Sequence, residues 1–279
     1  MTSGMPNPGA IGIFDSGVGG LSVLLSVQVL LPKEDLIYLA DQAHVPYGSR
    51  TLEEVRKFSE DITRYMLEQG VKLIVVACNT ASAAALHHLR AMFPKTPFVG
   101  MEPAIKPAAE VTRSGVVGVL ATPATFQGEL YASVIERFAS GVRVMQDTCP
   151  GLVMEIDRGN LATPSVYSIL EKALKPMLEE GIDTVVLGCT HFPFVIPAIK
   201  DIVGPAVRVI DPSPAIARQV ERLLDTHTLR SKNLDPSRVL YLTTGDPVRL
   251  EGLLPRLSGK AGSVGKLDWI DTGLGNFSA

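Results

Sequence analysis

An internal repeat is the feature of this sequence that most constrains how the chain can fold. Residues 66–78 match residues 177–189 without a gap, which aligns Cys78 with Cys189, 111 residues further along the chain. The same spacing carries the Pro-Ala-Ile segment at residues 103–105 onto a second copy. Two matches at one spacing indicate two related halves, each of which ends a core strand at a cysteine.

Short apolar runs rich in β-branched residues alternate with longer segments of helical period. We expect strands at residues 11–14, 36–39, 73–77, 116–120, 184–187 and 239–242, and helices at residues 20–31, 52–66, 125–138 and 166–178. Thr51 with Glu54 forms a predicted capping box at the start of the second helix. Alternating strands and helices predict an α/β protein made of two pseudo-symmetric doubly wound parallel-sheet domains, with the active site in the cleft between them.

Chain order predicts that the first domain is built from both ends of the chain. We expect residues 1–96 plus 212–279 to form this first α/β domain and residues 97–211 to form the second, with crossings near Pro97 and Asp211. The segment after residue 233 is less regular than the rest.

Composition excludes several classes of protein. Apolar residues make up 46% of the 279, and 26 Lys and Arg against 29 Asp and Glu leave a formal charge of −3, so no basic field for nucleic acid is expected. No apolar stretch approaches the roughly 20 residues needed to span a bilayer, and the first ten residues do not resemble a secretory signal. Three scattered cysteines do not make a disulfide scaffold. We therefore expect a cytoplasmic protein with reduced thiols and neither nucleic-acid nor membrane partners.

The paired cysteines indicate a specific kind of chemistry. Ligands of open α/β sheets bind outside the carboxyl ends of the strands, where Cys78 and Cys189 are expected, each before a helix start that favours a thiolate. Two equivalent thiols on opposite sides of one cleft suit the inversion of a stereocentre, which needs a base on one face and an acid on the other. A lone free cysteine is more often a buried apolar residue, and we assign that structural role to Cys149, which has no partner at the 111-residue spacing.

Polar residues follow three of the predicted strands. Asp15 and Ser16 precede a glycine-rich turn that lacks the dinucleotide fingerprint and a P-loop lysine. Asp15 is either a turn residue or a group that acts at the site as a base or as a partner of an ammonium group. His191 follows the second thiol by two residues and is a candidate for general acid–base assistance.

Taken together, the motifs resemble the bacterial glutamate racemase family. The resemblance runs from about residue 11 to residue 211 and rests on Asp-Ser-Gly at residues 15–17, Pro-Tyr-Gly at 46–48, Cys-Asn-Thr at 78–80 and Cys-Thr-His at 189–191. It implies a cofactor-independent isomerase that interconverts L- and D-glutamate and supplies the D-isomer for peptidoglycan. The two cysteine motifs alone would indicate the wider aspartate/glutamate racemase superfamily.

The resemblance also implies residue roles. Cys78 and Cys189 would be the proton donors and acceptors, assisted by Asp15 and His191 respectively. The residues that would line the glutamate site are Asp15, Ser16, Tyr47, Gly48, Asn79, Thr80, Thr122, Thr190 and His191. No metal ligand is implied, and homodimers are the commonest soluble assembly, so a homodimer is expected.

One departure from the family and three alternatives remain open at this stage. The family glutamate after the Cys-Pro segment is replaced by Asp157, so that either this shorter carboxylate or Glu155 takes its role. The alternatives are a racemase for aspartate or another small acidic substrate, a two-lobed protein that binds an acidic amino acid, and a metal site formed by Cys189, His191 and Asp15.

Overall fold

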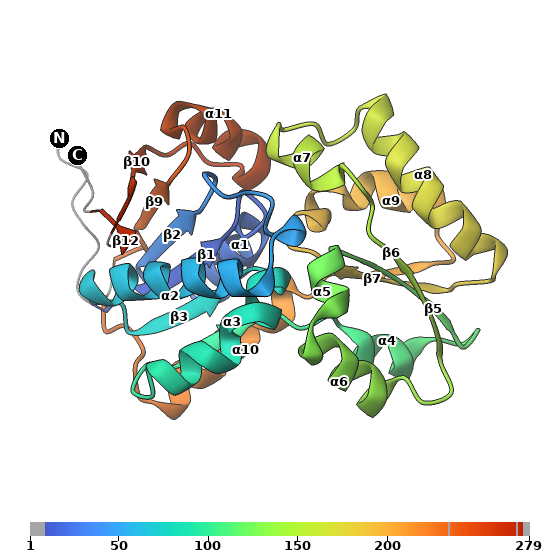
Figure 1. Ribbon diagram of the computed structural model, residues 1–279, viewed down its shortest axis with the longest axis horizontal. Helices are drawn as coiled ribbons and strands as arrows, with labels where there is room; N and C mark the ends of the chain where they lie inside the picture. Colours follow the sequence, from blue (N-terminus) through green and yellow to red (C-terminus); the bar gives the residue numbers. More distant parts are fainter. Residues whose placement is uncertain (1–8, 234, 272, 276–279) are drawn as a thin grey trace.

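The computed structural model describes residues 9–233, 235–271 and 273–275, and its core is two parallel sheets that lie side by side (Figure 1). The larger sheet has the strand order β10-β9-β2-β1-β3-β4. Its strands are β1 (Ile11–Asp15), β2 (Leu36–Ala40), β3 (Leu73–Val76), β4 (Phe98–Gly100), β9 (Val239–Thr243) and β10 (Val264–Lys266). A separate antiparallel pair, β11 (Trp269–Ile270) and β12 (Gly273–Leu274), follows β10.

The smaller sheet repeats the topology of the larger one. Its order is β6-β5-β7-β8, with β5 (Val116–Ala121), β6 (Arg143–Asp147), β7 (Thr184–Gly188) and β8 (Arg208–Ile210). These four strands correspond one to one to β2, β1, β3 and β4 of the larger sheet. All the strand pairs of both sheets are parallel. The expected pair of related doubly wound α/β halves is confirmed.

Helices cover both faces of the larger sheet. On one face lie α2 (Leu52–Glu68) and α3 (Asn79–Met92), and on the other lie α1 (Leu21–Leu30), α10 (Ser213–Thr226) and α11 (Pro247–Ser258). Successive side chains of a strand point to opposite faces, so Ile13 packs with the α1 side and Phe14 with the α2 side. This two-sided burial explains why the strands are apolar throughout.

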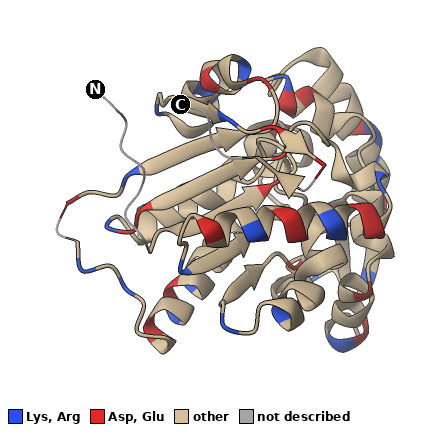
Figure 2. Ribbon diagram, turned by 60° about the vertical axis from the view of Figure 1, so that its left-hand side comes forward, with Lys and Arg blue, Asp and Glu red and all other residues tan. Residues whose placement is uncertain are grey.

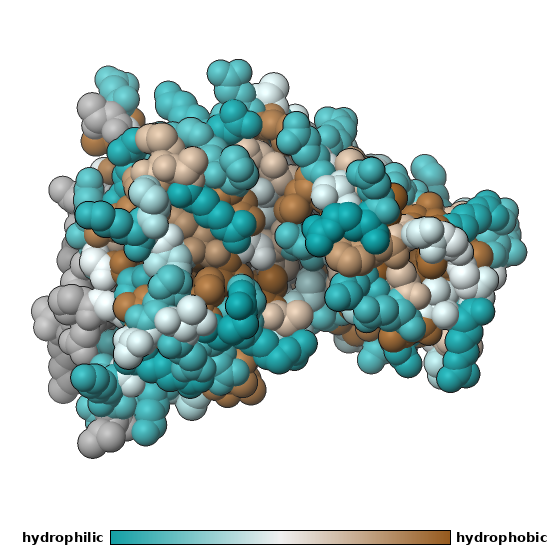
Figure 3. Space-filling model, turned by 90° about the horizontal axis from the view of Figure 1, so that it is seen from below, coloured by the Kyte–Doolittle hydropathy of each residue, from teal (hydrophilic) through white to brown (hydrophobic). Residues whose placement is uncertain are grey.

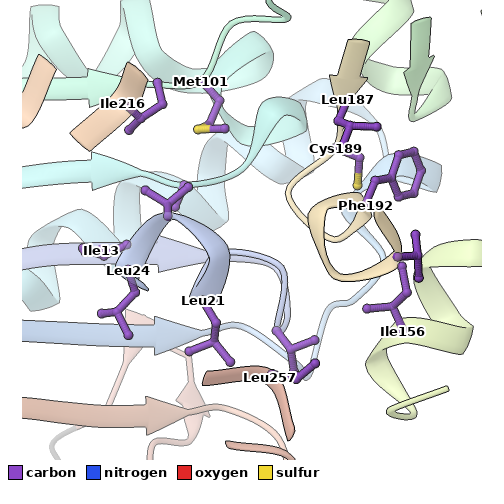
Figure 4. Packing of buried hydrophobic residues seen from close by; sticks show 14 of the residues in the cluster. Ile13, Leu21, Leu24, Met101, Ile156, Leu187, Cys189, Phe192, Ile216 and Leu257 are labelled. Atoms are coloured by element: carbon purple, nitrogen blue, oxygen red, sulfur yellow. The ribbon is translucent and has the colours of Figure 1, made fainter. Parts of the chain in front are cut away.

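The smaller sheet is covered in the same way. α4 (Ile105–Val111), α5 (Pro123–Gln127) and α6 (Glu129–Phe138) lie on one side, and α7 (Leu152–Asp157), α8 (Pro164–Glu179) and α9 (Ile196–Val203) lie on the other. Single turns of 3-10 helix occur at η1 (Tyr47–Ser49) and η2 (Phe192–Val195). Buried residues of α1 and of α7 and β7 belong to one apolar cluster, which therefore joins the two halves; Figure 4 shows Leu21 from the first half and Ile156 and Leu187 from the second.

Local sequence signals predicted six strands and four helices, and one of these four helices is divided in the structure. The capping box at Thr51 and Glu54 is present. The helix expected at residues 125–138 is instead two helices, α5 and α6, because Gly128 between them has an extended backbone. A Cβ at Gly128 would lie 2.7 Å from the Cβ of Ala83 on α3, so this break lets the segment approach the first half closely.

The strand pairing bears on where the chain crosses between the halves. β4 lies beyond Pro97 yet pairs with β3 in the larger sheet, whereas α4 packs on β7 in the smaller one. We therefore propose that the first crossing lies at residues 101–104 rather than at Pro97. The second crossing is proposed near Asp211, since β8 ends one residue earlier and α10 packs on α1.

The surface carries mixed charges. Figure 2 shows acidic and basic residues interspersed along the helices. From below, Figure 3 shows a larger and a narrower lobe, both with largely hydrophilic surfaces interrupted by small apolar patches. Across the described residues, no helix is both long and apolar enough to cross a membrane.

Candidate active site

The two repeated cysteines lie at equivalent strand ends and face one pocket. Cys78 follows β3 and is the N-cap residue of α3, and Cys189 directly follows β7. Each is 5% exposed. They line one narrow pocket, together with Ser16, Pro46, Tyr47, Gly48, Asn79, Thr80, Thr122, Val153, Thr190 and His191. The pocket thus gathers every predicted site residue except Asp15.

The pseudo-symmetry extends beyond the thiols. In the larger sheet Ile11 of β1 pairs with Leu73, and in the smaller sheet Val117 of β5 pairs with Thr184, at the same register relative to the cysteine. Counting on from these pairs makes Ser16 and Thr122 equivalent residues, one position past β1 and β5. Each half therefore contributes a thiol and a hydroxyl to the same pocket.

Asp15 lies behind Cys78 rather than in the pocket wall. It is fully buried and accepts hydrogen bonds from the N–H of Gly20 (2.7 Å) and from the Thr190 hydroxyl (3.3 Å). Burial raises the pKa of Asp15, although the charge of His191 and hydrogen bonds, including one from the Cys78 thiol, offset part of this effect. Asp15 is thus a hydrogen-bond partner of Cys78, and it is not among the residues that line the pocket described above.

The environment of Cys78 favours the neutral thiol. Burial and the neighbouring Asp15 carboxylate raise the pKa of Cys78 well above its usual value, and the N–H of Ala81 at the start of α3 offsets only part of this. The helix start lowers the pKa of Cys78, as expected, but burial beside a carboxylate outweighs this contribution. Asp15 is the group placed to accept the Cys78 proton.

The opposite thiol faces a histidine and a second carboxylate. The Cys189 sulfur lies 3.8 Å from Nδ1 of His191, and Nε2 of His191 lies 3.5 Å from Oδ1 of Asp157. Burial alone would lower the pKa of His191, but the Asp157 carboxylate and Cys189 outweigh it and raise this pKa well above its usual value. The imidazolium form is thereby favoured beside the Cys189 sulfur.

The structure distinguishes the two carboxylates that the sequence left open. Asp157 is 3% exposed, and its Oδ1 also accepts the N–H of Val18 at 3.1 Å. Glu155 instead binds Asn160 and lies near Arg158 at the surface side of α7. Asp157 is therefore the carboxylate that faces His191. Its other oxygen, Oδ2, is buried without a hydrogen-bond partner, as expected if a shorter side chain only partly reaches its neighbours.

Glycines of the β1–α1 turn allow the two halves to meet at the site. A Cβ at Gly17 would lie 2.8 Å from Oδ1 of Asp157, and one at Gly19 would lie 2.6 Å from Oγ1 of Thr190. Side chains at these two positions would collide with the residues that flank Cys189. The glycine-rich turn is thus required for close packing between the halves, not for a phosphate.

The pocket walls offer hydrogen-bond groups to an anionic ligand. Both amide atoms of Asn79 are buried without a partner, which points to a ligand that satisfies them. The hydroxyls of Thr80 and Thr122 lie 2.8 Å apart across the halves. None of the described residues that line the pocket is Lys or Arg, so a carboxylate there would depend on neutral donors and on the N-terminus of α3.

Sequence reasoning missed two wall residues. Pro46 belongs to the Pro-Tyr-Gly motif, and its place beside Tyr47 was the available signal. Val153 of α7 carries no such signal, because an apolar residue in a helix predicts only packing. Cys149 is a free cysteine that is 2% exposed and does not line the pocket with the other two. Among the described residues, no three His, Cys, Asp or Glu side chains are grouped to hold a metal ion.

Comparison with known proteins agrees with this geometry. The Asp/Glu/Hydantoin racemase family model matches residues 22–220. The chain is 48% identical to a glutamate racemase of Pseudomonas aeruginosa over 92% of this chain and 97% of that protein. It superposes on a glutamate racemase isoform from Bacillus anthracis with a TM-score of 0.83, at 33% identity over 93% of this chain and 97% of that one. It also superposes on the Escherichia coli glutamate racemase in complex with L-glutamate and the activator UDP-MurNAc-ala, with a TM-score of 0.80, at 33% identity over 92% of this chain and 97% of that one.

Proposed function

Because the chain belongs to the Asp/Glu/Hydantoin racemase family, we propose that it is an isomerase that interconverts L-glutamate and D-glutamate by proton transfer between two cysteines at Cα. The observation that carries this proposal is that Cys78 and Cys189, from equivalent strand ends, line one pocket, each beside its own acid–base partner. No cofactor is needed for this chemistry.

In the proposed reaction one cysteine acts as the base and the other as the acid. For one enantiomer the base is Cys189, whose sulfur lies beside His191, and the acid is Cys78, whose pKa is raised by burial beside Asp15. Cys189 removes the Cα proton from the enantiomer whose Cα–H faces it. Cys78 then delivers its proton to the opposite face of the same carbon, which inverts the stereocentre.

The second enantiomer requires the mirrored charge state. Asp15 accepts the proton of Cys78, since burial raises the pKa of this carboxyl, and His191 gives its proton to the Cys189 sulfur that it faces. Cys78 then removes the Cα proton from its own side and Cys189 returns one from the other. The two partners thus differ in kind, a carboxylate for Cys78 and an imidazole for Cys189, although the two thiols are equivalent in the fold.

Stabilisation of the developing carbanion is the harder requirement. As the Cα proton leaves, negative charge moves onto the substrate carboxylate, and donors already aimed at this group lower the barrier. The unpartnered Asn79 amide supplies such a donor in the pocket, beside the hydroxyl of Thr80.

The test compares three cysteine variants. Cys78→Ala and Cys189→Ala should each abolish racemisation of both enantiomers, whereas Cys149→Ala should retain it, measured by circular dichroism of the amino acid. In deuterated water, the first product formed should carry deuterium at Cα, while recovered substrate stays protiated, because the acid that donates is not the base that accepts. Full racemisation by either of the first two variants contradicts the two-thiol scheme.

Substrate choice is tested with the same assay. Glutamate should be turned over with a higher kcat/KM than aspartate; the reverse order would assign the enzyme to aspartate. An enzyme that binds glutamate without changing its optical rotation would be a binding protein instead.

We further propose that the D-glutamate serves peptidoglycan synthesis and that the protein acts in the cytoplasm as a homodimer. The resemblance to glutamate racemases supports the role in peptidoglycan synthesis. The proposed chemistry needs reduced thiols, which supports the cytoplasm. The homodimer is proposed because two-fold dimers are the commonest soluble assembly. Depletion of the protein should be rescued by D-glutamate in the medium, and sedimentation equilibrium should give twice the chain mass.

A further inference from the structure

A buried carboxylate outside the pocket collects donors from three separate parts of the chain. Asp41 directly follows β2, at the same sheet edge as the active site, and is fully buried. Its Oδ1 accepts hydrogen bonds from the hydroxyl of Thr244 (2.7 Å) and the indole N–H of Trp269 (2.8 Å). Its Oδ2 accepts from the hydroxyl of Tyr47 (2.6 Å) and Nδ1 of His44 (2.9 Å).

These donors connect the pocket to the carboxyl-terminal region. His44 and Tyr47 belong to the loop of residues 44–50, which we call the strap, while Thr244 follows β9 and Trp269 lies in β11. Each of the latter two residues is nearly 200 residues or more from the strap along the chain. Asp41 thus links the strap to two segments of the carboxyl-terminal region through hydrogen bonds.

The strap forms one side of the active-site pocket. Tyr47 and Gly48 line the pocket, and a Cβ at Gly48 would lie 2.8 Å from the Cβ of Thr122 in the other half. The Thr122 hydroxyl in turn lies 2.8 Å from that of Thr80. A shift of the strap would therefore change both the pocket wall and the contact between the halves.

Aromatic packing supports the same loop from outside. The His44 ring stacks on Phe58 of α2 at 3.9 Å between centroids, and the Trp269 ring meets His44 edge-on at 4.9 Å. The side chain of Arg50 closes the strap by donating to the His44 carbonyl at 2.6 Å. The strap is therefore held both by ring contacts of His44 and by hydrogen bonds to the Asp41 carboxylate.

We propose that Asp41 is a positioning residue for the racemisation. Its carboxylate holds Tyr47 and the strap in the position in which they enclose the substrate between the two thiols. This inference rests on the proposed function for its kinetic consequences. The carboxylate suits the role because it only accepts hydrogen bonds and can take all four donors at once. An asparagine at this position would turn an N–H₂ group toward two of the four donors.

Four variants test the proposal. Asp41→Asn changes the carboxylate itself, and Trp269→Phe removes one donor while keeping an aromatic ring against His44. Tyr47→Phe removes the strap donor, and its combination with Asp41→Asn completes a double-mutant cycle. Tyr65→Phe is the matched control, because the Tyr65 hydroxyl is buried on α2 without a partner and does not line the pocket.

The expected result is a selective loss of substrate handling in folded protein. Trp269→Phe should raise KM for glutamate several-fold with a smaller change in kcat, and Asp41→Asn should lower kcat/KM about tenfold or more, as for the loss of a hydrogen bond to a charged group. The Asp41→Asn/Tyr47→Phe pair should be clearly non-additive. Additive losses, or variants with wild-type kinetics and only a lowered Tm, would show that Asp41 is merely structural.

A second readout does not depend on the reaction. Because the strap covers the pocket, loosening it should speed alkylation of Cys78 by iodoacetamide, followed by mass spectrometry, in Trp269→Phe and Asp41→Asn but not in Tyr65→Phe. If the wild-type protein fails to racemise glutamate, the proposed function is wrong. The alkylation rate of Cys78 still decides whether Asp41 positions the strap. Unchanged alkylation rates in both variants would overturn the inference.

Discussion

The contact between Gly19 and the residues beside Cys189 gives the sharpest test of the site geometry. A Cβ at Gly19 would lie 2.6 Å from Oγ1 of Thr190 and 2.8 Å from Cε1 of His191, and closer still to Nδ1, whereas ordinary contact begins at 3.4 Å. Gly19 does not have a positive φ, so Gly19→Ala is not opposed by backbone strain and acts through this collision alone.

The expected loss of rate follows from how far the new Cβ and the His191 ring must move apart. The turn and the His191 ring must separate by roughly 1 Å, and a displacement of about this size in a catalytic group costs roughly 100-fold in rate. His191 cannot simply swing aside, because it is 1% exposed and held between Cys189 and Asp157. We therefore expect kcat for Gly19→Ala to fall about 100-fold, equivalent to about 2.7 kcal/mol in the barrier.

The assay is racemisation of each glutamate enantiomer by circular dichroism, with Tm measured in parallel. Gly252→Ala is the control, since a Cβ at Gly252 on α11 meets nothing within 4 Å; it should keep wild-type kcat and gain a few tenths to about 1 kcal/mol of stability from the helix propensity of alanine. A folded Gly19→Ala enzyme with wild-type kcat would refute the reasoning, because it would show that the two halves do not meet as described during turnover.

Three further predictions address charge, binding and stability. Asp157→Asn removes the carboxylate that raises the pKa of His191; the alkaline limb of the kcat/KM profile should move to lower pH, and a profile that does not move would contradict the ion pair. The same ion pair affects stability. A histidine whose pKa is raised by folding stabilises the folded state below its unfolded pKa of about 6.5, and this stabilisation is lost as the pH rises through the folded pKa. The difference in Tm between wild type and Asp157→Asn should therefore become smaller toward alkaline pH. Asn79→Ala should raise KM for glutamate about tenfold without lowering Tm, because it removes two buried amide atoms that have no partner in the protein; a lowered Tm with unchanged KM would mean that the amide serves the fold. Tyr38→Phe removes the hydroxyl that donates to the Gly17 carbonyl at 2.6 Å, and chemical denaturation should show a loss of about 1–3 kcal/mol in the free energy of unfolding, whereas an unchanged value would show that water replaces this bond.

Much of the fold was accessible from local patterns. Six strands were predicted because they are apolar throughout, and the start of α2 because its capping box is a local hydrogen-bond pair. The strands β4, β6 and β8 were missed, since β4 and β8 have only three residues each and β6 is partly exposed. The break at Gly128 was missed, since the reason for it is an approach to Ala83 on a distant helix. The strands after residue 247 were missed because β10, β11 and β12 have only two or three residues each and so carry no periodicity.

The candidate site divides in the same way. The repeat and the motifs located both thiols and the polar residues that follow them, and the structure brings these together in one pocket. Asp15 was expected to line the pocket and lies behind Cys78 instead, and Asp157 was left undecided against Glu155 until the position of His191 distinguished them. Asp41 gave no signal at all, because an aspartate after a strand resembles any turn residue.

The sequence by itself determined the duplicated architecture, the strand ends at which chemistry occurs and the residue types available there, because these depend on periodicity and spacing along one segment. Only the tertiary structure decided which groups meet and in what charge state. Burial beside Asp15 keeps Cys78 a thiol, whereas Asp157 from another helix keeps a proton on His191 beside Cys189. Desolvation and charge interactions depend on distance in space, and the groups that set them here come from separate segments of the chain: Asp15 and Cys78 are 63 residues apart, and Asp157 and His191 are 34 residues apart.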